Sequence, residues 1–152
     1  AVYLSELHLR GVYTEVDTKD IQFKLVLQSA CDEFMKASQK ADWLCKDLLY
    51  TVVNCHEKDN GEYTVFHGMK EEGKGRDNTF RTRVVPEGWY QRFIYKGDMF
   101  DIREAFMDDL YRWIIVKEVE LHSNGVGMLN IFEKDYLETG EVQIFVPIKG
   151  PQ

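Results

Sequence analysis

The sequence predicts an α+β domain built from two similar halves, at about residues 1–70 and 78–150 of the 152-residue chain. In each half, a strand, a break at glycine, a second strand, a long amphipathic helix and further strands follow in the same order. A polar stretch with two glycines, residues 70–78, lies between the halves and is typical of a linker. Because 152 residues suit one hydrophobic core, we expect a single domain over residues 1–152.

The first half begins with alternating side chains over Val2–Leu9, which indicate a strand. Gly11 is expected to interrupt this strand, and Val12–Val16 resumes it. A helix is predicted from Ile21 to about Ala41, because apolar residues recur there at spacings of three and four, and Asp20 is its expected N-cap.

Two strands rich in threonine, valine and aromatic residues complete the first half, over Tyr50–Cys55 and Tyr63–His67. The dipeptide Asn60-Gly61 between them is a strong hairpin signal. We therefore expect these strands to pair antiparallel.

The second half repeats the order. Strands are predicted over Thr79–Pro86 and Trp89–Lys96, and a helix that follows Gly97-Asp98 has apolar residues on one face. That face consists of Ile102, Phe106, Leu110 and Trp113. The remaining strands are predicted at residues 117–121, 129–133 and 142–148.

The strand Trp89–Lys96 places three rings, Trp89, Phe93 and Tyr95, on one face, because successive side chains of a strand alternate. The opposite face, which begins with Tyr90, is more polar and is expected to face water. A seam between two half-sheets that is lined with rings suits flat, apolar or cationic ligands. Packing in an ordinary core explains each single ring equally well.

Composition and charge exclude several classes of function. The net charge is −7, and no basic stripe or helix-turn-helix is present, so a DNA-binding domain would lie outside this chain. The four histidines are scattered, which predicts no metal or cofactor, and no catalytic motif is found. Three cysteines without Cys-x-x-Cys spacing, and no signal peptide or membrane-spanning run, predict a cytoplasmic protein. The chain begins with Ala1, which leaves open that it is part of a longer protein.

Four features occur in a characteristic order along nearly the whole chain. They are Leu9-Arg10-Gly11 at the end of a strand, Phe34 in the first helix, Pro86-Glu87-Gly88-Trp89-Tyr90 followed by Gly97, and Ile144-Phe145-Val146-Pro147-Ile148 in the last strand. Together they resemble the gyrase-inhibitor-like (GyrI-like) effector-binding family, which includes the C-terminal parts of AraC-type and MerR-type multidrug regulators.

The resemblance implies a pseudo-two-fold pair of β-α-β-β units with antiparallel sheets and a ligand groove between the halves. Members of the family bind lipophilic, often cationic, molecules. The family often has Glu-x-Tyr on the penultimate strand, and the matching positions here are Asn130 and Phe132. Asparagine offers hydrogen bonds and no negative charge, which argues against tight cation selectivity and against hydrolysis.

We therefore expect a non-catalytic domain that binds a lipophilic or aromatic effector, as the sensing part of a bacterial transcription regulator. The expected ligand-binding residues are Trp89, Phe93, Tyr95, Asn130 and Phe132, with Glu118 and Glu120 as acidic groups on the preceding segment. Two alternatives stay open: a stand-alone hydrolase in which Glu118 or Glu120 assists water and Tyr95 positions it, and a protein-interaction module like the gyrase inhibitors.

Overall fold

The computed structural model describes residues 1–54, 62–73 and 79–151, so the predicted turn at Asn60-Gly61 and most of the predicted linker lie outside the described residues. The elements are β1 (Val2–Leu4), β2 (Leu7–Asp17), α1 (Phe23–Ser38), β3 (Leu44–Asn54), β4 (Glu62–Glu71), β5 (Arg81–Val85), β6 (Gly88–Lys96), α2 (Ile102–Lys117), β7 (Val126–Glu133), α3 (Tyr136–Thr139) and β8 (Glu141–Pro147).

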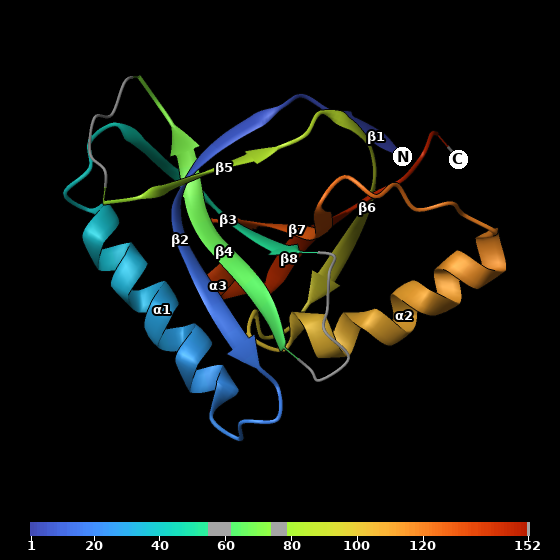
Figure 1. Cartoon of the computed structure of the whole chain (residues 1–152), viewed down its shortest axis with the longest axis horizontal. Coiled ribbons are helices and arrows are strands. Elements are labelled where there is room, and N and C mark those ends of the chain that lie inside the picture. The colour runs from blue at the N-terminus through green and yellow to red at the C-terminus, as the bar shows by residue number, and fades with distance from the viewer. Residues whose placement is uncertain (55–61, 74–78, 152) are drawn as a thin grey trace.

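The strands of the described chain form one antiparallel sheet in the order β1-β6-β8-β7-β3-β4-β2-β5 (Figure 1). This order is symmetric about the junction of β7 and β3, where Thr51 lies opposite Asn130. The two short leading strands are exchanged, since β1 pairs with β6 of the second half and β5 pairs with β2 of the first. The structure thus confirms the α+β, pseudo-two-fold, antiparallel prediction, with the two half-sheets joined edge to edge.

Gly11 does not interrupt a strand, which corrects the prediction. The interruption falls instead at Ser5-Glu6, between β1 and β2, and β2 runs through Gly11 without a break. A side chain is not tolerated at Gly11 because a Cβ there would lie 1.9 Å from the carbonyl oxygen of His67 and 2.7 Å from the Cα of Gly68 on β4. Glycine is thus needed for the close approach of two paired strands.

Replacing Gly11 with alanine should lower the free energy of unfolding by about 3 kcal/mol, because the clash is with backbone atoms that cannot rotate away. Gly150→Ala is the matched control, since nothing lies within 4 Å of a Cβ at that position. Chemical denaturation of both variants measures the difference. A loss at Gly11 no larger than at Gly150 would contradict the register of β2 and β4.

Both faces of the sheet are covered. Helices α1 and α2 lie on one face, at the left and lower right of Figure 1, and pack on a core that includes Val65, Phe106 and Ile144. The opposite face, on the inner side of the curled sheet, holds a second core that includes Phe66 and Tyr90. The prediction that the Tyr90 face of β6 meets water is therefore wrong at Tyr90 itself, although Arg92, Ile94 and Lys96 on that face are exposed.

Tyr90 is completely buried, and its hydroxyl group is hydrogen-bonded. It donates to the carbonyl oxygen of Pro86 at 2.7 Å and accepts from Nδ2 of Asn124 at 3.1 Å. Because the curl of the sheet encloses this end of β6, the ring becomes part of the second core.

Both long helices were predicted, and their limits differ by a few residues. In α1 the buried face consists of Leu27, Cys31, Phe34 and Ser38. Asp20 does not cap α1 but accepts a hydrogen bond from the backbone N–H of Gln22 at 2.9 Å, in the turn before the helix. In α2, Ile102, Phe106 and Leu110 are buried as predicted.

The predicted strand over residues 117–121 is wrong. Lys117 is the last residue of α2, and Glu118 ends the helix in a left-handed conformation with φ of 53°. Only Leu121 of this segment makes a strand-like pairing, an isolated bridge to Ile148. The short helix α3 after β7 was not predicted from the sequence.

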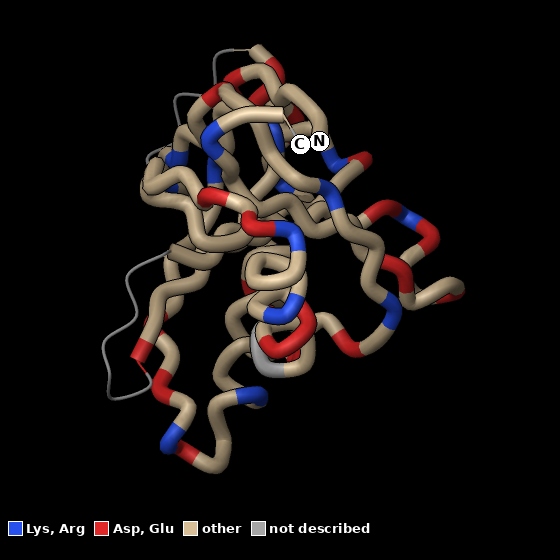
Figure 2. The backbone as a smooth tube through the Cα atoms, turned by 90° about the vertical axis from the view of Figure 1, so that its right-hand side faces the viewer, with Lys and Arg blue, Asp and Glu red and all other residues tan. Residues whose placement is uncertain are grey.

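The surface charges are mixed. In the view of Figure 2, acidic and basic residues are interspersed over the described chain and do not form one continuous basic band. Within the described ranges, no helix has both the length and the apolar character needed to cross a membrane.

Candidate functional site

The helix-covered face of the sheet carries two successive rows of side chains across its central strands β4, β3 and β7. The first row consists of His67, Thr51 and Asn130, which are aligned by the registers of the two strand pairs. The next residues on the same face are Met69, Leu49 and Phe132. Two residues along a strand span about 7 Å, so the two rows lie that far apart.

The first row is polar and buried. Nδ2 of Asn130 donates a hydrogen bond to Oγ1 of Thr51 at 3.0 Å, across the junction of the two halves. Oδ1 of Asn130 and Nδ1 of His67 are buried and have no hydrogen-bond partner among the described residues. These three side chains line a cavity of about 30 Å³, the inner cavity, whose other walls are Leu27, Val53, Tyr63, Val65, Met99, Phe100, Ile102 and Met128.

Burial lowers the pKa of His67 from 6.5 to about 4, so the imidazole is neutral at pH 7. A neutral imidazole carries one N–H donor and one acceptor nitrogen, and it supplies no positive charge to the inner cavity. The inner cavity therefore offers hydrogen bonds without a formal charge.

The stability of the protein should fall as the pH drops from 6.5 to about 4, because the unfolded chain takes up a proton at His67 that the folded chain does not. Above pH 6.5 both states are neutral at this position, and below about pH 4 the loss is complete. The shift in pKa corresponds to roughly 3 kcal/mol in the free energy of unfolding.

Chemical denaturation at several pH values, for the wild type and His67→Gln, measures this loss. The difference in unfolding free energy between the two proteins should change across the window from pH 6.5 to about 4. All other side chains are the same in the two proteins, so the comparison isolates the effect of His67. Parallel curves would contradict a neutral, buried His67.

The second row forms the floor of a larger cavity of about 340 Å³, the outer cavity. Its apolar lining is rich in methionine and consists of Met35, Leu49, Met69, Met99, Phe132, Tyr136 and Leu137, and its charged rim consists of Asp32, Lys46, Asp47, Glu133 and Lys134. On this rim Asp47 and Lys134 form an ion pair at 3.1 Å. The volume lies at the lower end of the range for small-molecule sites, and flexible methionine side chains adapt to ligands of different shape.

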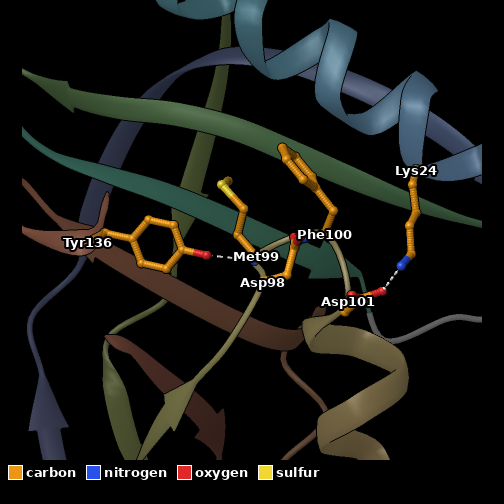
Figure 3. Close-up of polar contacts among 6 residues, drawn as sticks. All are labelled: Lys24, Asp98, Met99, Phe100, Asp101 and Tyr136. Atoms are coloured by element: carbon orange, nitrogen blue, oxygen red, sulfur yellow. Dashed lines mark hydrogen bonds and ion pairs between the residues drawn. The ribbon is translucent and has the colours of Figure 1, made fainter. Parts of the chain in front are cut away.

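The loop between β6 and α2 lies between the two long helices on this face (Figure 3). Met99 lines both cavities, and Phe100 lines the inner one. The hydroxyl group of Tyr136 accepts a hydrogen bond from the backbone N–H of Met99 at 2.7 Å and donates one to the carbonyl oxygen of Gly97 at 2.8 Å. Lys24 of α1 forms an ion pair with Asp101 at the start of α2. The loop is thus held by both helices and by α3.

Two of the predicted site residues lie together at these cavities. Asn130 lines the inner cavity and Phe132 the outer one, and both are on the helix-covered face of β7.

The three rings of β6 lie elsewhere. Phe93 packs beneath α2, with its ring centroid 5.1 Å from that of Phe106 and 5.0 Å from that of Trp113, and Tyr95 lies 6.5 Å from Phe106. At the start of β6, Trp89 packs edge-on against Tyr3 of β1 at 5.4 Å. The structure therefore places these rings in packing contacts and does not bring Trp89 to the two cavities.

Glu118 and Glu120 are exposed and follow the end of α2. Glu120 forms an ion pair with Lys149 at 3.1 Å. Neither carboxylate lies on a strand beside Asn130, because the segment that carries them is not a strand. Neither is among the residues that line the inner or the outer cavity.

Sequence analysis did not identify several residues of the two cavities, chiefly Thr51, His67, Met69, Met99 and Tyr136. Strand alternation places Thr51 and His67 on the same faces as Val53 and Val65, and this signal was present in the sequence. The methionines lack any periodic spacing, and Met99 and Tyr136 lie in a loop and in an unpredicted helix, so no local pattern indicated them.

Solved structures share this fold. One is SAV2435 bound to tetraphenylphosphonium, with a TM-score of 0.69 and 11% identity over 98% of this chain and 92% of that chain. Another is a protein from Staphylococcus aureus MU50 proposed to regulate bacterial transcription, with a TM-score of 0.65 and 12% identity over 98% and 96% of the two chains.

The C-terminal domain of EcmrR also has this fold, with a TM-score of 0.64 and 13% identity over 99% of this chain and 96% of that chain. The present chain also aligns with EcmrR in its complex with DNA, with a TM-score of 0.65 and 16% identity. The aligned region spans 56% of that EcmrR chain. No family model matches the sequence, and no curated protein is similar to it in sequence. The chain therefore has the fold of SAV2435 and of the EcmrR C-terminal domain, which confirms the structural side of its resemblance to the gyrase-inhibitor-like family.

Proposed function

We propose that this chain is a GyrI-like domain that binds a hydrophobic small molecule in the inner and outer cavities, and that it is the sensing part of a bacterial transcription regulator. The observation that carries the proposal is the outer cavity, with about 340 Å³ of space, a floor of Leu49, Met69 and Phe132, and a polar inner cavity beside it. A mostly apolar cavity with a few convergent polar groups is the usual form of a small-molecule site.

The comparisons support this proposal. SAV2435, which has the same fold, is bound to tetraphenylphosphonium, a lipophilic cation. EcmrR is bound to DNA in a complex in which its chain is nearly twice as long as the aligned region. By analogy, a DNA-binding segment of the proposed regulator would lie outside this chain, and this domain would supply the ligand response.

The loop over the cavities offers a route for signalling. A ligand that reaches the inner cavity must displace Met99, and the loop that carries Met99 is tied to α1 by the ion pair between Lys24 and Asp101 and to α3 by Tyr136. Displacement of the loop would therefore change how α1 and α2 are held. Regulation also requires that the ligand bind one state of the whole regulator more tightly than the other.

The two alternatives receive less support. The hydrolase alternative assigns the activation of water to Glu118 or Glu120, and both are exposed beyond α2 and do not line either cavity. The interaction-module alternative would be favoured by a groove too shallow for a drug-sized molecule, whereas the outer cavity has a volume typical of small-molecule sites.

Replacing Leu49 with tryptophan tests the location of the site. Leu49 lines the outer cavity, so the larger ring should fill it and weaken the binding of a hydrophobic probe at least 10-fold. Leu48→Trp is the matched control, because Leu48 lies next to it on β3 but packs in the second core on the opposite face. Isothermal titration calorimetry with tetraphenylphosphonium and 4-hexylphenol measures both variants. Equal affinities for the two variants would refute binding in the outer cavity.

A further inference from the structure

Asn130 and His67 line the inner cavity, and each has a buried polar atom that lacks a hydrogen-bond partner in the described part of the chain. Asn130 is 3% exposed and His67 is 2% exposed, and their Oδ1 and Nδ1 atoms have no hydrogen-bond partner among the described residues. Leaving such atoms unpaired is costly, so native proteins pair them with another group, with water or with a ligand. The inner cavity is therefore prepared to receive a hydrogen-bonding group.

That group must be small and uncharged. A volume of about 30 Å³ accepts a group about the size of one water molecule. Of the described residues that line the inner cavity, none is charged at neutral pH, since burial lowers the pKa of His67 to about 4. A buried ion would lack a counter-charge here, and burying an unpaired ion is far more costly than burying a neutral hydroxyl group.

We infer that the site selects an uncharged hydrophobic ligand that bears a hydroxyl group, and that Asn130 and His67 hold this hydroxyl in the inner cavity. This inference rests on the proposed function. The hydroxyl donates to Oδ1 of Asn130 and accepts from the Nδ1–H tautomer of His67, while Nδ2 of Asn130 keeps its bond to Thr51. The apolar body of the ligand lies in the outer cavity, about 7 Å away along the strands, after Met99 moves aside.

Calorimetric titration of the wild-type protein with three probes tests the inference: 4-hexylphenol, its methyl ether 4-hexylanisole, and tetraphenylphosphonium. We expect the phenol to bind at least 10-fold more tightly than the ether, which cannot donate to Asn130, and more tightly than the cation. This comparison needs no variant, so it does not depend on whether a substituted protein folds.

The variant Asn130→Leu tests whether Asn130 causes the preference for the phenol over the ether. This variant should bind phenol and ether with affinities within about 2-fold of each other, because the acceptor has been removed. Gln143→Leu is the control, since it removes an amide from the adjacent strand β8 on the other face of the sheet, where Gln143 bonds Glu133. That variant should keep the wild-type preference.

Different outcomes test the hydroxyl inference and the proposed function separately. If ether and phenol bind the wild type equally, or if the cation binds most tightly, the hydroxyl inference is overturned and the binding function stands. If none of the three probes binds the folded protein, the proposed function is overturned, and the inference with it.

Discussion

Replacing Asn130 with glutamate should raise the affinity for tetraphenylphosphonium by about 10-fold at neutral pH and above, which is about 1.4 kcal/mol. Asn130 is 3% exposed, so a carboxylate there would attract a bound cation through protein rather than through water. Two unit charges about 7 Å apart, the spacing of the two rows, interact by about 2.4 kcal/mol at an effective dielectric constant of about 20. The cost of removing water from both ions offsets part of this attraction.

The same variant should bind the cation in a pH-dependent way. In the free variant the carboxylate at position 130 has no counter-charge, and burial raises its pKa above the usual range for glutamate. The free variant therefore holds a proton that must leave when a cation binds. As a result, affinity should rise with pH through the raised pKa and level off above it.

Asn130→Gln is the matched control, because glutamine has the length of glutamate without its charge. It should bind the cation with an affinity that is weak and independent of pH between 5 and 8. Titration calorimetry of both variants over this range, after circular dichroism has shown that both are folded, makes the comparison. If the two variants bind the cation equally, the ligand does not lie at position 130, and the alignment of Asn130 with the acidic position of the family is wrong.

Most helices and strands were predictable from local patterns, because an element with one buried face has apolar residues at a regular spacing. The alternation over Trp89–Lys96 and the spacing of Ile102, Phe106 and Leu110 each reflect one buried face, and the structure confirms β6 and α2. The order of the elements predicted two similar halves, and the resemblance to a family implied their pseudo-two-fold arrangement. What the sequence did not show is that β1 and β5 exchange between the halves, since that depends on distant pairings.

The wrong predictions have a common physical cause, which is contact between distant parts of the chain. Glycine within a strand often marks an irregularity, which predicts a break at Gly11, but here Gly11 allows the close approach of β4. Tyr90 was expected to meet water because its neighbours on that face are polar, but the curl of the sheet encloses it. Residues 117–121 alternate like a strand, yet alternation alone cannot supply a pairing partner.

The candidate site was predictable only in part. Asn130 and Phe132 were identified through the resemblance to a family, and the structure places both at the cavities. Thr51 and His67 join them only because β3 lies between β4 and β7 in the sheet, which no local pattern specifies. The loop with Met99 depends on hydrogen bonds to Tyr136, 37 residues later, so its position could not be read from its own sequence.

Replacing Met99 with alanine should raise the affinity for 4-hexylphenol about 10-fold. Met99 lines both cavities, so a ligand that reaches from one to the other must displace its thioether from a half-buried position. Full burial of a methionine side chain contributes about 1.5–3 kcal/mol, and half of that, about 0.8–1.5 kcal/mol, reaches the 1.4 kcal/mol of a tenfold change at its upper end. In the Met99→Ala variant this side chain is already absent, so ligand binding no longer includes the cost of displacing it.

The Met99→Ala protein should also be less stable by about 1–2 kcal/mol without ligand, since burial and packing are lost. Saturating phenol should restore much of this loss, because a ligand that binds only the folded state stabilises it. Met35→Ala is the control, because Met35 lines the outer cavity alone and loses the same atoms. Met35→Ala should weaken binding, because it removes contacts with the ligand and leaves Met99 in place between the cavities. If both variants weaken binding equally, Met99 is a wall of the site, and the inner cavity is not reached by displacing it.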